Sequence, residues 1–312
     1  AGAGAARSSA RRAASRRGPV RLDRETRDMV RRAIREDLGR RGDITTRDLL
    51  PAGGRYRARI VAKQDGVVCG MDVAAEVFRQ VCPRARFSAK ARDGRRVRAG
   101  DVIAVVRGPR EILSAERTAL NFLQHLSGIA TLTSLYAAKV RGTRARIYDT
   151  RKTLPGWRAL AKYAVRTGGG SNHRMGLFDM AMLKDNHLAA LKTTGRKPRE
   201  GAQQDFVRLR VREFRRRHPR VPIEIEAVDE REVRLALAAG ADIILLDNMR
   251  PSVMASHIRL IRSAAPRTRI ETSGGVSLRD VARIARLGPD RISVGRITHS
   301  APALDIGMDI DR

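Results

Sequence analysis

Residues 147–188 read IYDTRKTLPGWRALAKYAVRTGGGSNHRMGLFDMAMLKDNHL, and this stretch decides which fold the sequence predicts. A short apolar run at 147–148 stops abruptly at Asp149-Thr150-Arg151-Lys152, and a second apolar run at 180–183 stops at Lys184. Cationic and hydrogen-bonding side chains therefore gather just past short apolar runs. This pattern is typical of sites for small anionic ligands that are built at the ends of strands.

The sequence after residue 143 alternates short apolar runs with helical patterns. Such alternation builds a parallel sheet, either open or closed into a barrel. The expected strands are Arg146–Tyr148, Met180–Leu183, Ile223–Ala227, Ile243–Leu246, Arg269–Glu271 and Arg291–Val294. The expected helices are Phe206–Arg217, Glu230–Ala239, Ser252–Ala264 and Leu278–Arg286. The polar, basic segment Leu191–Gln204 contains Gly and Pro, which predicts a surface loop.

The first 110 residues predict a separate α+β region. A helical pattern from Leu22 closes at Gly39, and residues 42–46 read as a loop. Strands are expected at Tyr56–Ala62, Gly66–Cys69 and Val102–Arg107, with a helix at Val73–Val81. A long helical stretch, Ile112–Arg141, follows, and we expect an interruption near Ser127-Gly128. The tail Ala301–Ile310 is too short to fold alone and should dock on an earlier element.

Composition narrows the class of protein. With 312 residues and 42% hydrophobic residues the chain can bury a large core, and no apolar run is long enough for a membrane span. The net charge of +31 suggests either a polyanion partner or arginines on solvated helix faces; their even distribution favours the second reading. Residues 1–21 predict a disordered basic tail rather than a transit peptide. Cys69 and Cys82 lack ligand spacing, which indicates buried thiols in a reducing, cytoplasmic setting.

Polar residues stand at the ends of the later strands too. The third expected strand contains Glu224 and Glu226, which the two-residue period of a strand puts on one face, and Asp247 follows the fourth strand. Glu226 and Asp247 should therefore lie on neighbouring strands at one mouth. Acids there could bind sugar hydroxyls, hold Mg²⁺, or form salt bridges to the arginines. Glycine-rich turns, Ser273-Gly274-Gly275 and Ser293-Val294-Gly295, follow the last two strands and favour a phosphate cradle. The residues thus indicate a barrel enzyme for a planar anionic acid and a sugar phosphate.

Seven motifs, in order, closely resemble the quinolinate phosphoribosyltransferase family, the carboxylating nicotinate-nucleotide pyrophosphorylases. They are ERTALNFLQHLSGIAT (116–131), DTRKTLPGWRALAKYAVRTGGGSNHRMGL (149–177), KDNHL (184–188), IEIEA (223–227), LLDNM (245–249), ETSGGV (271–276) and DRISVG (290–295). The run EDLGRRGDITT (36–46) extends the likeness into the first region. The long second motif is highly specific, whereas LLDN or SGG alone is not.

This resemblance implies a fold, an activity and partners. The fold is an α/β sandwich domain followed by an incomplete β/α (TIM-like) barrel, the type II phosphoribosyltransferase architecture. We expect a tail at 1–21, the sandwich at 22–128, the barrel at 129–297, and a segment at 298–312 returning to the sandwich. The implied reaction joins quinolinate and phosphoribosyl pyrophosphate (PRPP), with Mg²⁺, to give nicotinate mononucleotide, pyrophosphate and CO₂ in NAD biosynthesis. A homodimer is implied, with each subunit covering the other's barrel mouth.

The resemblance also implies roles for individual residues. Arg151, Arg174 and Lys184 would hold the two quinolinate carboxylates beside His173, and Arg117 would reach in from the partner subunit. Lys152 would meet the pyrophosphate end of PRPP, next to Thr150. The ribose hydroxyls would contact Glu226 and Asp247 directly or through Mg²⁺. The 5′-phosphate would lie on two turns: Ser273, Gly274 and Gly275; and Ser293, Val294 and Gly295.

Two alternatives stay open at this point. A related enzyme acting on nicotinate would need fewer cations, because nicotinate has one carboxylate and quinolinate has two adjacent ones. Four cations, Arg117, Arg151, Arg174 and Lys184, favour the diacid. A nucleic-acid binder would explain the high charge, but the sequence lacks zinc-finger spacing and RNP-like aromatics, so nucleic acid is the less favoured partner.

Overall fold

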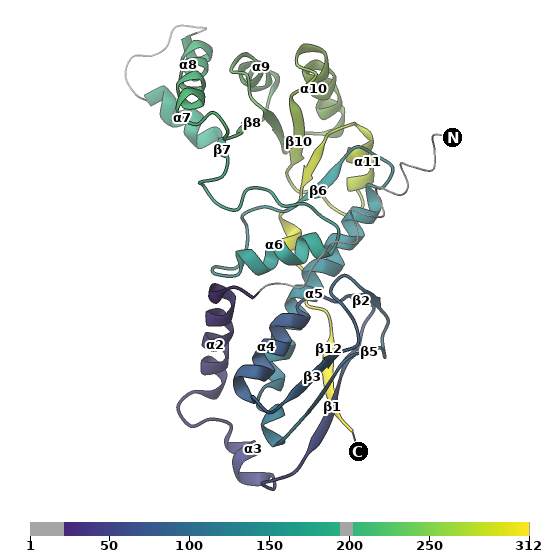
Figure 1. Cartoon of the computed structure of the whole chain (residues 1–312). Coiled ribbons are helices and arrows are strands. Elements are labelled where there is room, and N and C mark those ends of the chain that lie inside the picture. The colour runs from purple at the N-terminus through teal and green to yellow at the C-terminus, as the bar shows by residue number, and fades with distance from the viewer. Residues whose placement is uncertain (1–21, 194–201, 312) are drawn as a thin grey trace, which may run out of the picture.

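Two sheets of opposite kind organise the chain, and one long helix runs between them (Figure 1). The computed structural model describes residues 22–193 and 202–311. The predicted basic tail at 1–21 lies outside these residues. Within the described residues, no helix has both the length and the apolar character required to cross a bilayer.

The first sheet is antiparallel, with strand order β12-β1-β5-β3. Its strands are β1 (Tyr56–Ala62), β3 (Arg86–Ala89), β5 (Val102–Gly108) and β12 (Ile306–Ile310). Strand β1 alternates exposed arginines, Arg57 and Arg59, with buried Ala58 and Ile60, as expected for a sheet with one face on the core. Helices α2 (Arg24–Leu38) and α4 (Met71–Val81) pack together on this region, and β2 (Gly66–Val67) pairs with β4 (Arg96–Val97).

The edge strand β12 comes from the end of the chain. It pairs antiparallel with β1 over five residue pairs, from Ala58 opposite Ile310 to Ala62 opposite Ile306. Ion pairs such as Lys63 to Asp309 (2.9 Å) lie on the surface and contribute little, about 0–1 kcal/mol. Backbone pairing and the buried side chains of Leu304 and Ile306 therefore hold the returning segment.

The long helix α5 (Glu116–Lys139) is unbroken, so the predicted interruption at Ser127-Gly128 is wrong. A Cβ atom on Gly128 would lie 2.1 Å from the carbonyl oxygen of Pro302. The glycine therefore permits close packing of the C-terminal segment on the helix rather than ending the helix. Helix α5 spans the junction near residue 128 and packs on both α4 and α6 (Arg158–Thr167).

The second sheet is parallel, with order β6-β11-β10-β9-β8-β7, and confirms the predicted strands to within two residues. The strands are β6 (Arg146–Tyr148), β7 (Ala181–Leu183), β8 (Ile223–Ala227), β9 (Ile243–Asp247), β10 (Arg269–Ser273) and β11 (Arg291–Ser293). Helices α9 (Glu230–Ala238), α10 (Pro251–Ala264), α11 (Val281–Arg286) and α12 (Arg296–His299) connect or follow them. In the described residues β6 and β7 are the two edge strands of this sheet and do not pair with each other, so the β/α barrel is incomplete.

Two segments predicted as loops contain helices. Helix α7 (Asp185–Thr193) and helix α8 (Ala202–Arg217) occupy both ends of the expected loop Leu191–Gln204, whose middle lies outside the described residues. The sequence Ala-Gln-Gln that opens α8 has good helix propensity, which outweighs its polarity. Helix α3 (Ile44–Leu49) replaces most of the loop predicted at 42–46, because the Asp43 carboxylate accepts a hydrogen bond from the Thr46 backbone N–H (2.9 Å).

Candidate active site

A pocket of about 690 Å³ lies at the carboxyl ends of the parallel strands. Fourteen of the fifteen residues expected at the site line it. They are Thr150, Arg151, Lys152, His173, Arg174, Lys184, Glu226, Asp247, Ser273, Gly274, Gly275, Ser293, Val294 and Gly295. Arg117 lies on an exposed position of α5 and does not line this pocket. The strand ends therefore bring together residues that are up to 145 positions apart (150 to 295).

One end of the pocket is rich in cations. Burial and the nearby charge of Arg151 lower the pKa of Arg174, so these two guanidinium groups are close enough to repel each other. The buried Nε of Arg151 has no hydrogen-bond partner in the structure. Arg174 donates from Nη1 to the carbonyl oxygen of Met180 at 3.1 Å. Two neighbouring guanidinium groups with spare donors form a site for an anion with more than one acceptor group.

The turn that carries Arg151 is held from below by a buried ion pair. Lys162 of α6 donates to Oδ1 of Asp149 at 2.5 Å, and both side chains are at most 2% exposed. The same oxygen accepts the backbone N–H of His173 at 2.8 Å, and Lys162 also donates to the carbonyl oxygen of His173 at 3.0 Å. Asp149 and Lys162 thus join the two loops that carry Arg151 and Arg174, a role that sequence reasoning missed.

Acidic groups line the neighbouring part of the pocket. Lys184, just after β7, donates to Oε2 of Glu226 on β8, and the Ser273 hydroxyl donates to Oδ1 of Asp247. Carboxylate oxygens are the ligands that Mg²⁺ prefers, and Glu226 and Asp247 come from adjacent strands. These two residues therefore fit the predicted metal-binding role, provided that the cation displaces or bridges the present contacts.

Backbone geometry explains the glycines of the turn after β10. Gly274 has a φ of +95°, and a Cβ atom there would lie 2.5 Å from the Cα of Asn248. Asn248 itself has a φ of 52°, an unusual value for a residue with a side chain, and its backbone N–H donates to the Ser273 carbonyl at 3.0 Å. The turns after β9 and β10 therefore pack backbone to backbone, which leaves a smooth wall suited to phosphate oxygens.

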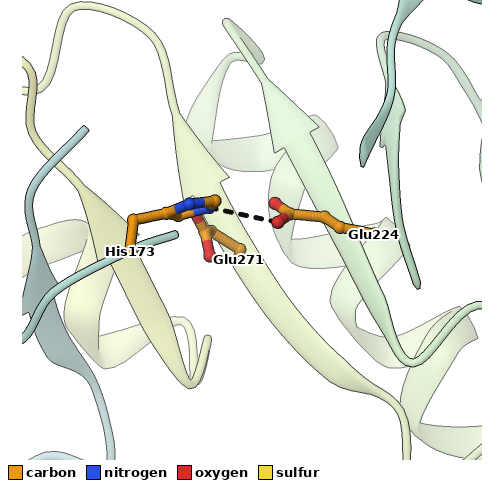
Figure 2. A group of neighbouring side chains, drawn as sticks. All are labelled: His173, Glu224 and Glu271. Carbon is orange, nitrogen blue, oxygen red and sulfur yellow. Dashed lines mark ion pairs between the residues drawn. The ribbon is translucent and has the colours of Figure 1, made fainter. Parts of the chain in front are cut away.

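Beneath this mouth lies a buried cluster that the sequence did not indicate (Figure 2). Nε2 of His173 lies 3.1 Å from Oε2 of Glu224 on β8 and 3.3 Å from Oε1 of Glu271 on β10. Glu224 is 0% and Glu271 1% exposed. Both expected glutamates of β8 do face the barrel interior, but only Glu226 reaches the pocket, whereas Glu224 contacts His173.

The cluster retains a proton at neutral pH. Burial lowers the pKa of His173, but its interactions with Glu224 and Glu271 outweigh burial and raise that pKa to about 9. Burial, together with the charge of Glu271, also raises the pKa of Glu224. The backbone N of Arg174 lies 2.8 Å from Nδ1 of His173, and Nδ1 can accept that N–H only in the form of the imidazole whose single proton is on Nε2, facing the carboxylates. The titrating proton therefore belongs to His173 and Glu224 together.

One imidazole and two carboxylates are also a ligand set that suits a metal ion. The three ligand atoms of His173, Glu224 and Glu271 lie within 4.8 Å of one another. His173 and Glu271 of this group line the pocket and Glu224 lies behind them, and none of the three is Glu226 or Asp247. Sequence reasoning gave no role to further residues that line the pocket: Met182, Leu245, Asn248, Glu271, Val276, Ser277, Arg296 and His299. Four of them, Leu245, Asn248, Glu271 and Val276, lie inside the family motifs LLDNM and ETSGGV, and this position was the available signal.

An incomplete β/α barrel with a cation-lined pocket at its strand ends defines an enzyme site for a small, multiply charged anion. Comparison with known proteins then places the chain. Residues 43–127 match the family description "Quinolinate phosphoribosyl transferase, N-terminal domain", and residues 129–309 match "Quinolinate phosphoribosyl transferase, C-terminal domain". The chain belongs to the quinolinate phosphoribosyl transferase family.

Individual relatives cover nearly the whole chain. The carboxylating nicotinate-nucleotide pyrophosphorylase of Mycobacterium leprae is 43% identical, over 91% of this chain and 96% of that protein. A probable enzyme of the same name from Synechocystis is 40% identical, over 89% of this chain and 90% of its own length. The nicotinate-nucleotide pyrophosphorylase structure from Ehrlichia chaffeensis superposes with a TM-score of 0.82 at 34% identity, covering 91% of this chain and 98% of that one.

Proposed function

We propose that this protein transfers the phosphoribosyl group of PRPP to quinolinate with loss of CO₂, giving nicotinate mononucleotide and pyrophosphate. The observation that carries this proposal is the pair of neighbouring guanidinium groups on Arg151 and Arg174. The positive charges of the two groups repel each other, and the buried Nε–H of Arg151 has no hydrogen-bond acceptor among the described residues. A planar acid with two adjacent carboxylates would relieve the repulsion and supply acceptors to both groups.

Lys184 completes the diacid subsite in this proposal. Lys184 pairs with Glu226 in this structure, so binding of both substrates would separate the two side chains and bring each of them into contact with a substrate group. The Lys184 ammonium would meet a quinolinate carboxylate, and the Glu226 carboxylate would meet a ribose hydroxyl beside Asp247. Lys152, exposed on its turn, would contact the pyrophosphate, with Thr150 next to it. The turns at 273–275 and 293–295 would hold the 5′-phosphate.

Mg²⁺ would be held with PRPP by Glu226 and Asp247, and when bound it would neutralise charge on the pyrophosphate leaving group. The carboxylate oxygens of both residues line the pocket and fit this role. Cys69 and Cys82 are buried and free, which is compatible with a reducing compartment, and a cytoplasmic location stays a prediction.

The chain's own residues would act mainly by placing the reactants. The guanidinium groups would fix the quinolinate ring so that its nitrogen faces C1 of the ribose. The nitrogen–C1 bond then forms as the C1–oxygen bond to pyrophosphate breaks, and the electron pair leaves with the pyrophosphate. Cations beside the leaving group stabilise the charge that develops there. The carboxylate next to the nitrogen departs as CO₂, the newly cationic ring accommodates the electron pair left on that carbon, and the carbon then takes up a proton from water.

A homodimer belongs to the same proposal. Arg117 is exposed and lies outside the pocket of its own chain, so a role in catalysis requires a second subunit. The apolar residues Leu154, Leu177 and Phe178 are also exposed (49%, 72% and 79% of each residue), on the segments that follow Lys152 and Arg174 in the chain. Such surfaces are typical of protein interfaces.

Arg174→Ala tests the assignment. We expect its KM for quinolinate to rise about 100-fold, since a charge-assisted hydrogen bond contributes about 1.5–3 kcal/mol, while the KM for PRPP stays unchanged. Arg234→Ala, which removes an exposed arginine of α9 paired with Glu230, is the matched control and should have wild-type constants. Equal effects on both substrates would contradict the diacid role of Arg174.

A further inference from the structure

On the open side of the barrel an irregular segment, rather than a further strand, lies beside β6. Ser171 forms a parallel bridge with Tyr148, its N–H donates to the Ile147 carbonyl at 2.7 Å, and the Asp149 N–H donates to the Ser171 carbonyl at 3.1 Å. The chain then crosses into the interior at His173 before reaching Arg174. A segment with so few ladder hydrogen bonds needs other contacts to hold it in place.

The backbone of His173 is held by Asp149 and Lys162, and its side chain supplies further contacts. It reaches across the interior to Glu224 on β8 and Glu271 on β10, the two strands on either side of β9 (Figure 2). Ser293 on β11 donates to Oε1 of Glu271 at 2.5 Å, which fixes that carboxylate. The imidazole is therefore anchored on the far wall of the barrel, 7% exposed.

The anchor is coupled directly to the pocket. Nδ1 of the same imidazole accepts the backbone N–H of Arg174, so the orientation of the ring sets where that backbone lies. Among the residues that the structure describes, neither carboxylate oxygen of Glu224 accepts a hydrogen bond of good geometry. The contact between Glu224 and His173 is therefore an electrostatic one and not a well-directed hydrogen bond. Arg291, whose Nη1 lies 3.6 Å from Oε2 of Glu271, offsets part of the negative charge of the two glutamates.

We propose that Glu224 and Glu271 are positioning residues that act through His173 to place Arg174 for the diacid. They touch no substrate in this account. Removal of Glu224 would leave the phosphate and ribose parts of the pocket intact, because those parts are built on other residues. Glu271 also accepts the hydroxyl of Ser293 in the phosphate turn, so Glu224 is the residue whose loss separates the diacid part from the phosphate part. The proposal rests on the proposed function, since it uses quinolinate as the reporter of the position of Arg174.

The test uses the full-length protein with Glu224→Gln and Glu271→Gln, each of which keeps the size of the side chain and removes its charge. We expect Glu224→Gln to raise the KM for quinolinate about 10- to 100-fold, as for misplacement of a binding group by up to about 1 Å, and to leave the KM for PRPP unchanged. Glu271→Gln should raise the KM for quinolinate by a similar factor, but it also alters the contact with Ser293 of the phosphate turn, so the PRPP criterion applies to Glu224→Gln. Glu76→Gln is the matched control: Glu76 is a buried glutamate of α4 that pairs with Arg79, remote from the pocket.

A double-mutant cycle decides whether the glutamates act through His173. The double variant His173→Gln/Glu224→Gln should have the same KM for quinolinate as His173→Gln alone. Additive effects, or equal losses for quinolinate and PRPP, would overturn the proposal. So would a stoichiometric divalent metal in the purified wild type that Glu224→Gln lacks, because the cluster would then be a metal site.

Three outcomes remain distinguishable. If one glutamine variant fails to fold, the other one and His173→Gln carry the test; unfolding of all three would assign the cluster to stability alone and overturn the proposal. If the wild type does not turn over quinolinate, the proposed function fails. If the wild type does and the glutamine variants match it, the proposed function stands and the positioning role is wrong.

Discussion

Lys162→Met should destabilise the protein strongly, because it leaves a buried carboxylate without its cation. Asp149 is 0% exposed. The substitution removes both hydrogen bonds of the Lys162 ammonium, to Asp149 at 2.5 Å and to the His173 carbonyl at 3.0 Å. Breaking a buried ion pair from one side costs about 3–5 kcal/mol. At about 2–4 °C per kcal/mol, the Tm should fall by about 10 °C.

The pH dependence of this loss has a defined sign. Burial raises the pKa of Asp149 and the charge of Lys162 opposes that rise, so removing Lys162 raises the pKa further. The folded variant then binds a proton on Asp149 more readily than its unfolded chain does, and it gains stability relative to wild type as pH falls. The deficit should be largest at neutral pH and should shrink as pH falls through the raised pKa of Asp149.

Urea titrations of wild type and variant at several pH values between about 5 and 8 measure this deficit. Lys139→Met is the control, since Lys139 is exposed on α5 and its loss should change stability by no more than about 0.5 kcal/mol. The double variant Asp149→Asn/Lys162→Met should recover much of the lost stability, because no unpaired charge stays buried. A deficit that is independent of pH, or a double variant as weak as the single one, would refute the reasoning.

Three further predictions concern packing and the metal. Gly128→Ala should destabilise the protein by about 1–3 kcal/mol in urea titrations, because the added methyl meets the Pro302 carbonyl; wild-type stability would contradict the close contact. Gly274→Ala should raise the KM for PRPP more than that for quinolinate, because its Cβ would push on Asn248. Chelation should abolish turnover and added Mg²⁺ restore it, with Asp247→Asn needing a higher Mg²⁺ concentration than wild type; full activity in chelator would refute the metal role.

The sequence predicted the parallel sheet and the pocket well for a physical reason. Each strand of that sheet is a short buried run, and the residue just after it must leave the core at the same edge of the sheet. The positions of polar residues such as Arg151, Lys184 and Asp247, just after apolar runs, therefore marked them as candidate site residues. The order of the family motifs strengthened this prediction. The six strands followed from this rule, and the fourteen pocket residues followed from it together with the family resemblance.

Contacts across the interior could not be predicted in the same way. His173 meets Glu271, almost one hundred positions later, inside the barrel, and strand periodicity assigns Glu224 only to a face. The predicted helix interruption at Gly128 was wrong because a glycine in a helical pattern indicates either a break or close packing of another segment on the helix. The segment that packs there contains Pro302, which lies far along the chain. Sequence patterns report local geometry, whereas these features depend on pairs that only the fold brings together.

The most direct test of the central claim is a turnover assay. Purified protein with Mg²⁺ and PRPP is given either quinolinate or nicotinate, and the product is identified by mass. The account predicts nicotinate mononucleotide and CO₂ from quinolinate and no product from nicotinate. Product from nicotinate with none from quinolinate would contradict the claim that Arg151, Arg174 and Lys184 form a site for a diacid.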